Sequence, residues 1–223
     1  MNLLDALRSR RLMAIIRGTD PAAATRTVLT LAEEGVSMLE VSLTTPGAFR
    51  VISRARAELG SEASVGAGTV ITAEDADRAA DAGADFAVTP AIVPGLRTAA
   101  ERGLPLLAGA LTPTEIVAAT QHGAAAVKLF PASLGGVRYL RALLDPFPAA
   151  ALVPVGGVDA GAAREYLAAG AVAVGVGSPL VGDAASGGSP GDLRVRARQF
   201  LATVRAAGGG PLPDDAPRRG VRQ

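Results

Sequence analysis

The feature that most constrains the fold of this chain is an alternation of short apolar runs with longer amphipathic segments that end in glycine. Short apolar runs bounded by turn residues are typical of buried strands. A glycine after an amphipathic segment is typical of a helix end, where the backbone becomes left-handed. The candidate strands lie at residues 12–16, 38–43, 64–67, 86–89, 106–110, 125–130, 151–155 and 171–176. The predicted helix ends lie at Gly35, Gly83, Gly103, Gly123 and Gly170.

Repetition of this unit predicts the architecture. Eight strand and helix pairs in succession require parallel strands joined by right-handed crossovers. Closing such a sheet removes its edges, so we predict an α/β fold with a single (β/α)₈ TIM barrel; a doubly wound open sheet is the alternative. An extra N-terminal helix is expected at residues 2–10 and the last barrel helix at 191–205. We assign residues 1–206 to the barrel and predict a disordered tail at 207–223, where glycine, proline and charge replace the apolar periodicity.

Composition excludes several classes of site and partner. The chain has no cysteine and a single histidine, His122, which argues against disulfides and against metal sites built from thiolates or imidazoles. We therefore expect no metal and no cofactor, and His122, at a predicted helix end, is given no role. The 22 basic and 21 acidic residues are dispersed, so we expect neither nucleic acid nor a membrane as a partner. With no secretory signal and no membrane span of about 20 apolar residues, the expected location is cytoplasmic.

Lys128 is the one lysine among the 22 basic residues, and it lies in an apolar strand. Side chains of a barrel strand alternate between the interior and the helix layer, which places Ala126, Lys128 and Phe130 inside. Unlike a guanidinium, an amine can lose its proton and attack a carbonyl carbon, and the iminium so formed accepts electrons. Lys128 is therefore either a Schiff-base nucleophile or a structural lysine paired with a buried carboxylate.

The second strand supplies that carboxylate. Alternation along residues 38–43 points Met38, Glu40 and Ser42 into the barrel. A carboxylate in a barrel interior is costly unless it is paired, and beside a reactive amine it can donate and accept protons. Glu40 is thus a candidate general acid and base, or a structural partner of Lys128.

Glycine-rich turns indicate where a ligand binds. In barrels, the loops after the seventh and eighth strands commonly present backbone N–H groups to a phosphate, and here these loops contain Gly156, Gly157, Gly177 and Ser178. After the third strand, Thr69 offers a hydroxyl suited to a carboxylate or carbonyl oxygen. At the end of the first strand, Arg17 can clamp a carboxylate or a phosphate. These positions predict a phosphorylated substrate.

The motifs that carry these residues resemble a known family. In chain order they read AIIRG, LEVSLTTP, VGAGTV, FAVTP, LTPTE, AVKLFPAS, VPVGGV and VGVGSPL. Together they resemble the 2-keto-3-deoxy-6-phosphogluconate (KDPG) and 4-hydroxy-2-oxoglutarate (KHG) aldolases. The resemblance implies a metal-independent class I aldolase that cleaves a phosphorylated 2-keto-3-deoxy sugar acid, KDPG, into pyruvate and glyceraldehyde 3-phosphate. It also implies a homotrimer.

The resemblance also implies a role for each matching residue. Lys128 corresponds to the Schiff-base lysine and Glu40 to the proton shuttle. The positions expected to bind substrate are Arg17, Thr69, Pro90, Phe130 and Val155, and those expected to hold the phosphate are Gly156, Gly157, Gly177 and Ser178.

Two departures from the family pattern bear on the substrate. Thr44 stands where many members have arginine, which removes a cation and shifts its work to Arg17. Val155 stands where gluconate-type enzymes have threonine, as it does in enzymes specific for the galactonate epimer (KDPGal). A KDPGal or KHG aldolase is therefore an alternative, and a phosphate-barrel isomerase or a non-catalytic binding protein for phospho sugar acids ranks below these.

Overall fold

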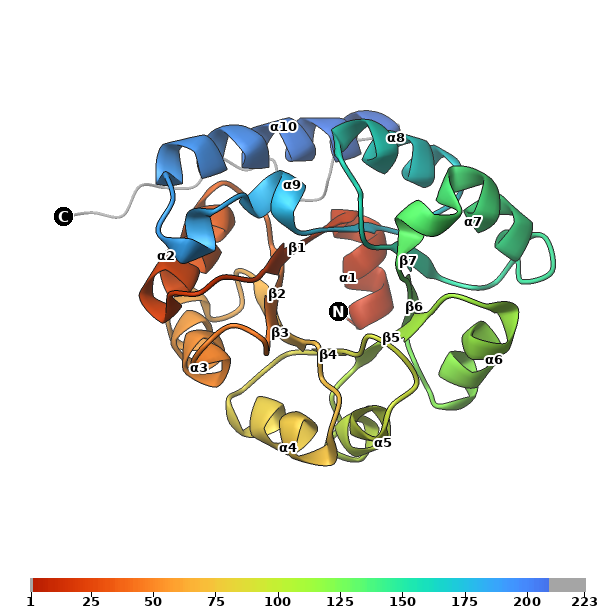
Figure 1. The fold of residues 1–223 in the computed structure, drawn as a ribbon, viewed down its shortest axis with the longest axis horizontal. Helices are drawn as coiled ribbons and strands as arrows, with labels where there is room; N and C mark the ends of the chain where they lie inside the picture. The colour runs from red at the N-terminus through yellow and green to blue at the C-terminus, as the bar shows by residue number, and fades with distance from the viewer. Residues whose placement is uncertain (1, 209–223) are drawn as a thin grey trace.

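Eight parallel strands form a closed ring at the centre of the computed structural model, which describes residues 2–208 (Figure 1). They are β1 (Leu12–Ile16), β2 (Met38–Ser42), β3 (Ser64–Gly68), β4 (Ala87–Val88), β5 (Leu106–Ala110), β6 (Ala126–Leu129), β7 (Leu152–Pro154) and β8 (Val174–Val176). The ring closes between β7 and β8, where Val155 and Gly175 form a parallel bridge and the Val172 N–H donates to the Leu152 carbonyl over 3.0 Å. The predicted (β/α)₈ barrel is confirmed, and the open doubly wound sheet is wrong.

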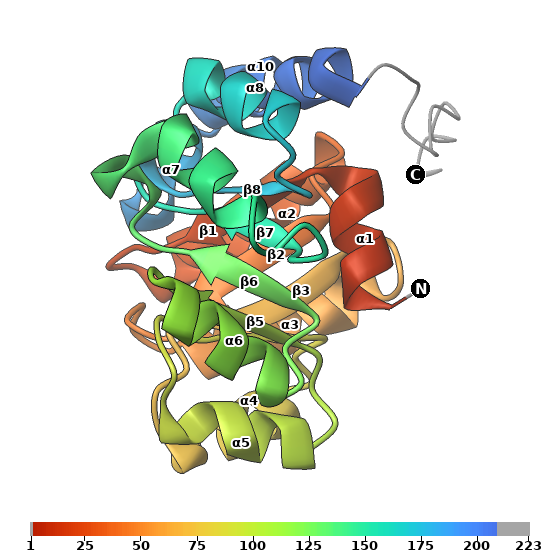
Figure 2. The same cartoon turned by 90° about the vertical axis from the view of Figure 1, so that its right-hand side faces the viewer.

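Helices alternate with the strands and cover the outside of the ring (Figures 1 and 2). They are α2 (Pro21–Glu33), α3 (Ala48–Leu59), α4 (Ala73–Asp81), α5 (Pro94–Glu101), α6 (Pro113–Gln121), α7 (Gly136–Leu144), α8 (Ala160–Ala168), α9 (Ser178–Val181) and α10 (Pro190–Gly208). All five glycines predicted at helix ends have left-handed backbones, with φ between 70° and 105°. Within residues 2–208, no helix combines the length and apolar character needed to cross a membrane.

The ends of the chain differ slightly from prediction. The extra N-terminal helix is present as α1 (Leu3–Arg10). The last helix, α10, continues past the predicted end at residue 205 as far as Gly208, because alanines at 206 and 207 favour helix. The first two residues of the tail predicted at 207–223 therefore belong to α10, and the others lie outside the described residues. The one-turn helix α9 was not predicted.

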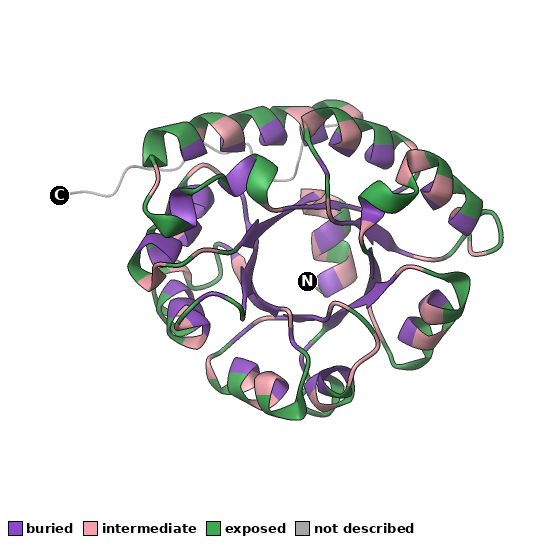
Figure 3. Ribbon diagram, viewed as in Figure 1, coloured by how far each residue is buried: buried purple, intermediate pink, exposed green. Residues whose placement is uncertain are grey.

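Alternation along the strands builds two separate cores. One face of each strand packs against the helices, and the other fills the ring. The strands are accordingly almost entirely purple, the colour of buried residues, in Figure 3. The inner core contains Met13, Phe86 and Leu107, and α1 adds Leu3 and Leu7 to it. Helix α1 therefore closes one end of the barrel, and the carboxyl ends of the strands are left for a ligand.

Two inward-facing glycines of β3 make room for larger neighbours. A Cβ atom at Gly66 would overlap the ring of Phe86, and one at Gly68 would overlap the carboxyl group of Glu40. Neither position could carry a side chain without moving its neighbour. The absence of a side chain at Gly68 is thus what allows Glu40 to extend into the barrel.

A network of charges joins the first and last helices of the outer layer. Glu34, at the end of α2, accepts hydrogen bonds from Arg194 Nη1 over 2.8 Å and from Arg198 Nε over 2.7 Å, both on α10. The hydrogen bond from Arg198 is the main cause that holds the pKa of the Glu34 carboxyl below its ordinary value, although partial burial opposes it. The network stabilises the contact that closes the helix ring.

We expect Glu34→Gln to lower the free energy of unfolding by about 1 kcal/mol at neutral pH, because it removes a charge-assisted contact that is only partly screened by solvent. A lowered folded-state pKa means that this stabilisation is complete above the unfolded pKa and is lost as the pH falls through the folded one. Urea unfolding of both proteins from pH 7 to pH 3 should therefore show the difference shrinking below about pH 4. A difference that grows in acid would contradict this assignment.

Candidate active site

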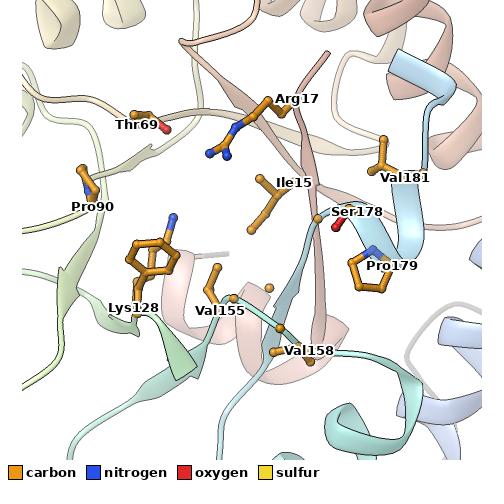
Figure 4. A pocket seen from close by; sticks show the side chains of 16 residues that line it. Ile15, Arg17, Thr69, Pro90, Lys128, Val155, Val158, Ser178, Pro179 and Val181 are labelled. Carbon is orange, nitrogen blue, oxygen red and sulfur yellow. The ribbon is translucent and has the colours of Figure 1, made fainter. Parts of the chain in front are cut away.

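A cavity of about 450 Å³ opens at the carboxyl ends of the strands (Figure 4). Every residue that the sequence assigned to substrate or phosphate binding lines it, and so does Lys128. These residues are Arg17, Thr69, Pro90, Phe130, Val155, Gly156, Gly157, Gly177 and Ser178. Glu40 is the exception: it is buried in the barrel next to Lys128 and is absent from the cavity lining. The fold therefore brings the residues singled out in the sequence from six strand ends to one cavity.

Lys128 and Glu40 form a buried pair. The side chain of Lys128 is 8% exposed and that of Glu40 is 1% exposed, and 3.6 Å separates Lys128 Nζ from Glu40 Oε1. Neither carboxylate oxygen accepts a hydrogen bond from any residue of the described chain. A buried ion pair stabilises a fold only when its remaining lone pairs are satisfied. This pair is therefore poorly suited to a structural role, and both carboxylate oxygens remain available as hydrogen-bond acceptors.

The amine of Lys128 is also covered by an aromatic ring. Its nitrogen lies 5.5 Å from the centroid of the Phe130 ring, within the range of a cation–π contact. Phe130 is 39% exposed and forms part of the cavity surface. The ring thus limits access of water to the amine from one side while the cavity leaves the other side open.

Hydroxyl groups hold the cation on the opposite side of the cavity. Arg17 Nε donates to Ser42 Oγ over 3.4 Å, and Ser42 Oγ lies 3.0 Å from Thr69 Oγ1 and 2.8 Å from Thr44 Oγ1. Thr69 has a left-handed backbone with φ of 62°, which is uncommon for a β-branched residue. The sequence pointed Ser42 into the barrel, but its contacts with three other side chains depend on the folded arrangement and were not predicted.

The far end of the cavity is bounded by backbone. Gly156 and Gly157 have φ of 96° and 73°, and a Cβ at Gly157 would come within 2.8 Å of the Ser133 side chain. Residues 177–182, which contain the single turn of α9, form another part of the cavity wall. The cavity residues that sequence reasoning did not assign are largely apolar: Ile15, Val158, Gly175, Pro179, Val181 and Gly182. They are neighbours in sequence of assigned residues, and their composition carries no signal of its own.

The described part of the chain contains no group of three or more side chains of the types His, Cys, Asp and Glu that could hold a metal ion. His122 caps the C-terminal end of α6 and is exposed, as its position in the sequence indicated. The cavity therefore offers an amine with a carboxylate 3.6 Å away, a guanidinium, and glycine backbone. Such a set fits an anionic carbonyl compound that reacts covalently with the amine.

Comparison with known proteins identifies relatives. A family model described as KDPG and KHG aldolase matches residues 3–187. The probable 2-dehydro-3-deoxy-6-phosphogalactonate aldolase of Rhizobium meliloti is 37% identical over 203 residues, which cover 90% of this chain and 94% of that protein. A designed, cube-shaped cage of fused symmetric oligomeric domains has a TM-score of 0.83 and 33% identity, over 88% of this chain and 73% of that one. KDPG aldolase from Legionella pneumophila, with pyruvate captured as a covalent carbinolamine, has a TM-score of 0.77 and 26% identity, over 92% of this chain and 98% of that one.

Because the buried pair of Lys128 and Glu40 lacks further hydrogen-bond partners, we expect a single substitution to destabilise the protein more than a double one. Lys128→Met alone leaves a buried carboxylate without a counter-charge and should lower the free energy of unfolding by about 3 kcal/mol at neutral pH. Adding Glu40→Met should restore most or all of that loss, because apolar side chains of similar length replace both charges. Guanidinium unfolding of the parent, both single variants and the double variant checks this. A double variant less stable than either single one would instead mean that the pair holds the barrel together.

Proposed function

The chain belongs to the KDPG and KHG aldolase family, and we propose that it is a Schiff-base aldolase that needs no metal and cleaves KDPG into pyruvate and glyceraldehyde 3-phosphate. The observation that carries this proposal is the amine of Lys128, at the cavity, 3.6 Å from the carboxylate of Glu40. Carbinolamine formation in the Legionella pneumophila relative supports the same chemistry here.

Covalent bond formation comes first. Glu40 takes a proton from Lys128, and the free amine attacks C2 of the 2-keto acid. The proton passes to the former carbonyl oxygen, which gives a carbinolamine, and loss of water then leaves an iminium between Lys128 and C2. The positively charged nitrogen draws electrons from the neighbouring carbon, so it activates the next bond for cleavage.

Cleavage and release complete the cycle. The C4 hydroxyl gives up its proton, the C3–C4 bond breaks, and its electron pair moves into the iminium to form an enamine while the aldehyde leaves. Glu40 is absent from the cavity lining, so we propose that the water expelled in the first stage relays protons between its carboxylate and the C4 hydroxyl. Protonation of C3 and hydrolysis of the iminium then release pyruvate and restore Lys128.

The remaining cavity residues orient the two anionic ends of the substrate. We assign the carboxylate end to Arg17 and Thr69, which share Ser42 as a hydrogen-bond partner. Pro90 and Phe130 line the region around the amine. The phosphate end is assigned to the glycine-rich backbone of Gly156, Gly157, Gly177 and Ser178, where close approach to N–H groups is not blocked by side chains.

A second candidate substrate is the C4 epimer of KDPG. Val155 lies on the cavity surface and has no hydroxyl that would read the C4 configuration, and the Rhizobium meliloti relative is named for the galactonate substrate. A KHG aldolase is a third possibility within the family, although KHG has no phosphate to use the glycine-rich end. An isomerase is disfavoured, because the described cavity lining contains neither a carboxylate nor a histidine to form a second acid or base.

The assembly proposed for the chain is a homotrimer. Similarity to the oligomeric domains of the designed cage supports an oligomer of some kind. That the oligomer is a trimer is proposed from the resemblance to the family.

Trapping with borohydride tests the covalent mechanism. Incubation with pyruvate and borohydride should add one reduced pyruvate to the protein, and peptide mass spectrometry should place it on Lys128, the single lysine of the chain. Lys128→Arg should abolish both the adduct and turnover, because a guanidinium stays protonated. Retention of near-normal turnover in this variant would contradict the proposal. Turnover that survives Lys128→Arg but is lost in Glu40→Gln would favour an isomerase.

Substrate choice is tested with the two epimers. We expect the parent protein to cleave both KDPG and its galactonate epimer, with kcat/KM values within about tenfold of each other, because an apolar side chain at position 155 discriminates weakly. Val155→Thr replaces a methyl group by a hydroxyl of similar volume. It should raise the kcat/KM for KDPG relative to that for the epimer by about tenfold. Val155→Ala is the matched control that removes bulk without adding a hydroxyl. An equal shift in both variants would mean that volume, and not hydrogen bonding, controls the choice.

A further inference from the structure

One wall of the cavity is a short segment with little internal support. Residues 177–182, here called the α9 wall, contribute Gly177, Ser178, Pro179, Val181 and Gly182 to the cavity surface. Its single helical turn is closed by hydrogen bonds from the N–H groups of Val181 to Gly177, over 2.9 Å, and of Gly182 to Ser178, over 2.8 Å. The last carbonyl groups of a helix have no partner within it, so the wall depends on contacts from elsewhere.

Arg196 supplies those contacts from α10. Its Nε donates to the carbonyl of Leu180 over 2.7 Å, and its Nη2 donates to the carbonyl of Val181 over 3.0 Å. In Figure 1, α9 lies between the ring of strands and α10. One guanidinium therefore joins two successive carbonyls of the wall to the longest helix of the outer layer.

The fit between Arg196 and the wall is close. A Cβ atom at Gly182 would lie 2.6 Å from Arg196 Nη2 and 2.9 Å from its Cζ, and Gly182 has a φ of 58°. No side chain can be placed there while the guanidinium stays where it is. The backbone at the end of the wall is thus shaped to receive this guanidinium.

We propose that Arg196 is a positioning residue for the phosphate end of the cavity. By holding the carbonyls of Leu180 and Val181, it sets where Ser178 stands relative to Gly157 on the facing wall. This inference rests on the proposed function, because it concerns how the same cavity binds a phosphorylated substrate. Arg196 is absent from the cavity lining and lies beyond the residues matched by the family model, which end at 187.

Arg196→Met is the variant that tests the proposal, since it keeps the packing of the stem and removes the donors. The measurement is the kcat/KM for KDPG divided by the kcat/KM for the same sugar acid without its phosphate. We expect this ratio to fall about tenfold, because displaced backbone donors weaken a contact that only the phosphorylated substrate makes. Arg196→Lys retains a donor and should give an intermediate ratio.

Arg198→Met is the matched control. It removes an arginine from the same helix whose hydrogen bonds go to Glu34 and not to the α9 wall, and it should leave the ratio at the parent value. A ratio unchanged in Arg196→Met, or an equal fall for both substrates, would overturn the positioning role. Should Arg196→Met not fold, Arg196→Lys decides by the same ratio, and a parent-like value there overturns the role.

Borohydride trapping separates this inference from the function on which it rests. If the parent protein forms no pyruvate adduct, the proposed function fails and the role of Arg196 fails with it. If the parent and Arg196→Met both trap pyruvate to the same extent while the substrate ratio falls, Arg196 acts on the phosphate end alone, as proposed. An adduct in the parent together with an unchanged ratio removes Arg196 only.

Discussion

The burial of two opposite charges inside a ring of strands is the constraint around which the rest of this structure is arranged. Glu40 on β2 and Lys128 on β6 stand four places apart in the order of eight strands, so they reach towards each other across the barrel. Burying two charges costs free energy that their attraction alone does not offset. The apolar side chains of the inner core, among them Met13, Met38 and Phe86, supply part of the difference.

Around this pair, the fold separates chemistry from binding. The amine proposed to react comes from Lys128 on a strand that is paired on both sides, which keeps its position constant. The groups assigned to the anionic ends of the substrate come from turns and from the short helix α9, where the backbone itself faces the cavity. Strands thus hold the amine of Lys128, and loops and the short helix α9 carry the groups assigned to the anionic ends of the substrate.

Much of this arrangement follows from local sequence patterns. Alternation along two strands was enough to predict that Lys128 and Glu40 both point into the barrel, because side chains two residues apart share one face of a strand. The helix ends were found because glycine has a specific backbone role there. By contrast, the hydrogen bonds of Ser42 and Arg196 join segments far apart in the chain, and α9 is a single turn held by such a contact. Patterns of local periodicity contain no information about these partners.

The lack of a side chain at Gly68 has a consequence for how sequences of this fold can vary. The space that a methyl group would need there is already filled by the carboxyl group of Glu40. A larger residue at position 68 is compatible only with a shorter acid at position 40, and a shorter acid would withdraw from the amine across the ring. Positions 40 and 68 can therefore change only together. If position 68 alone is randomised and variants are selected for a function that needs Glu40, glycine should be recovered.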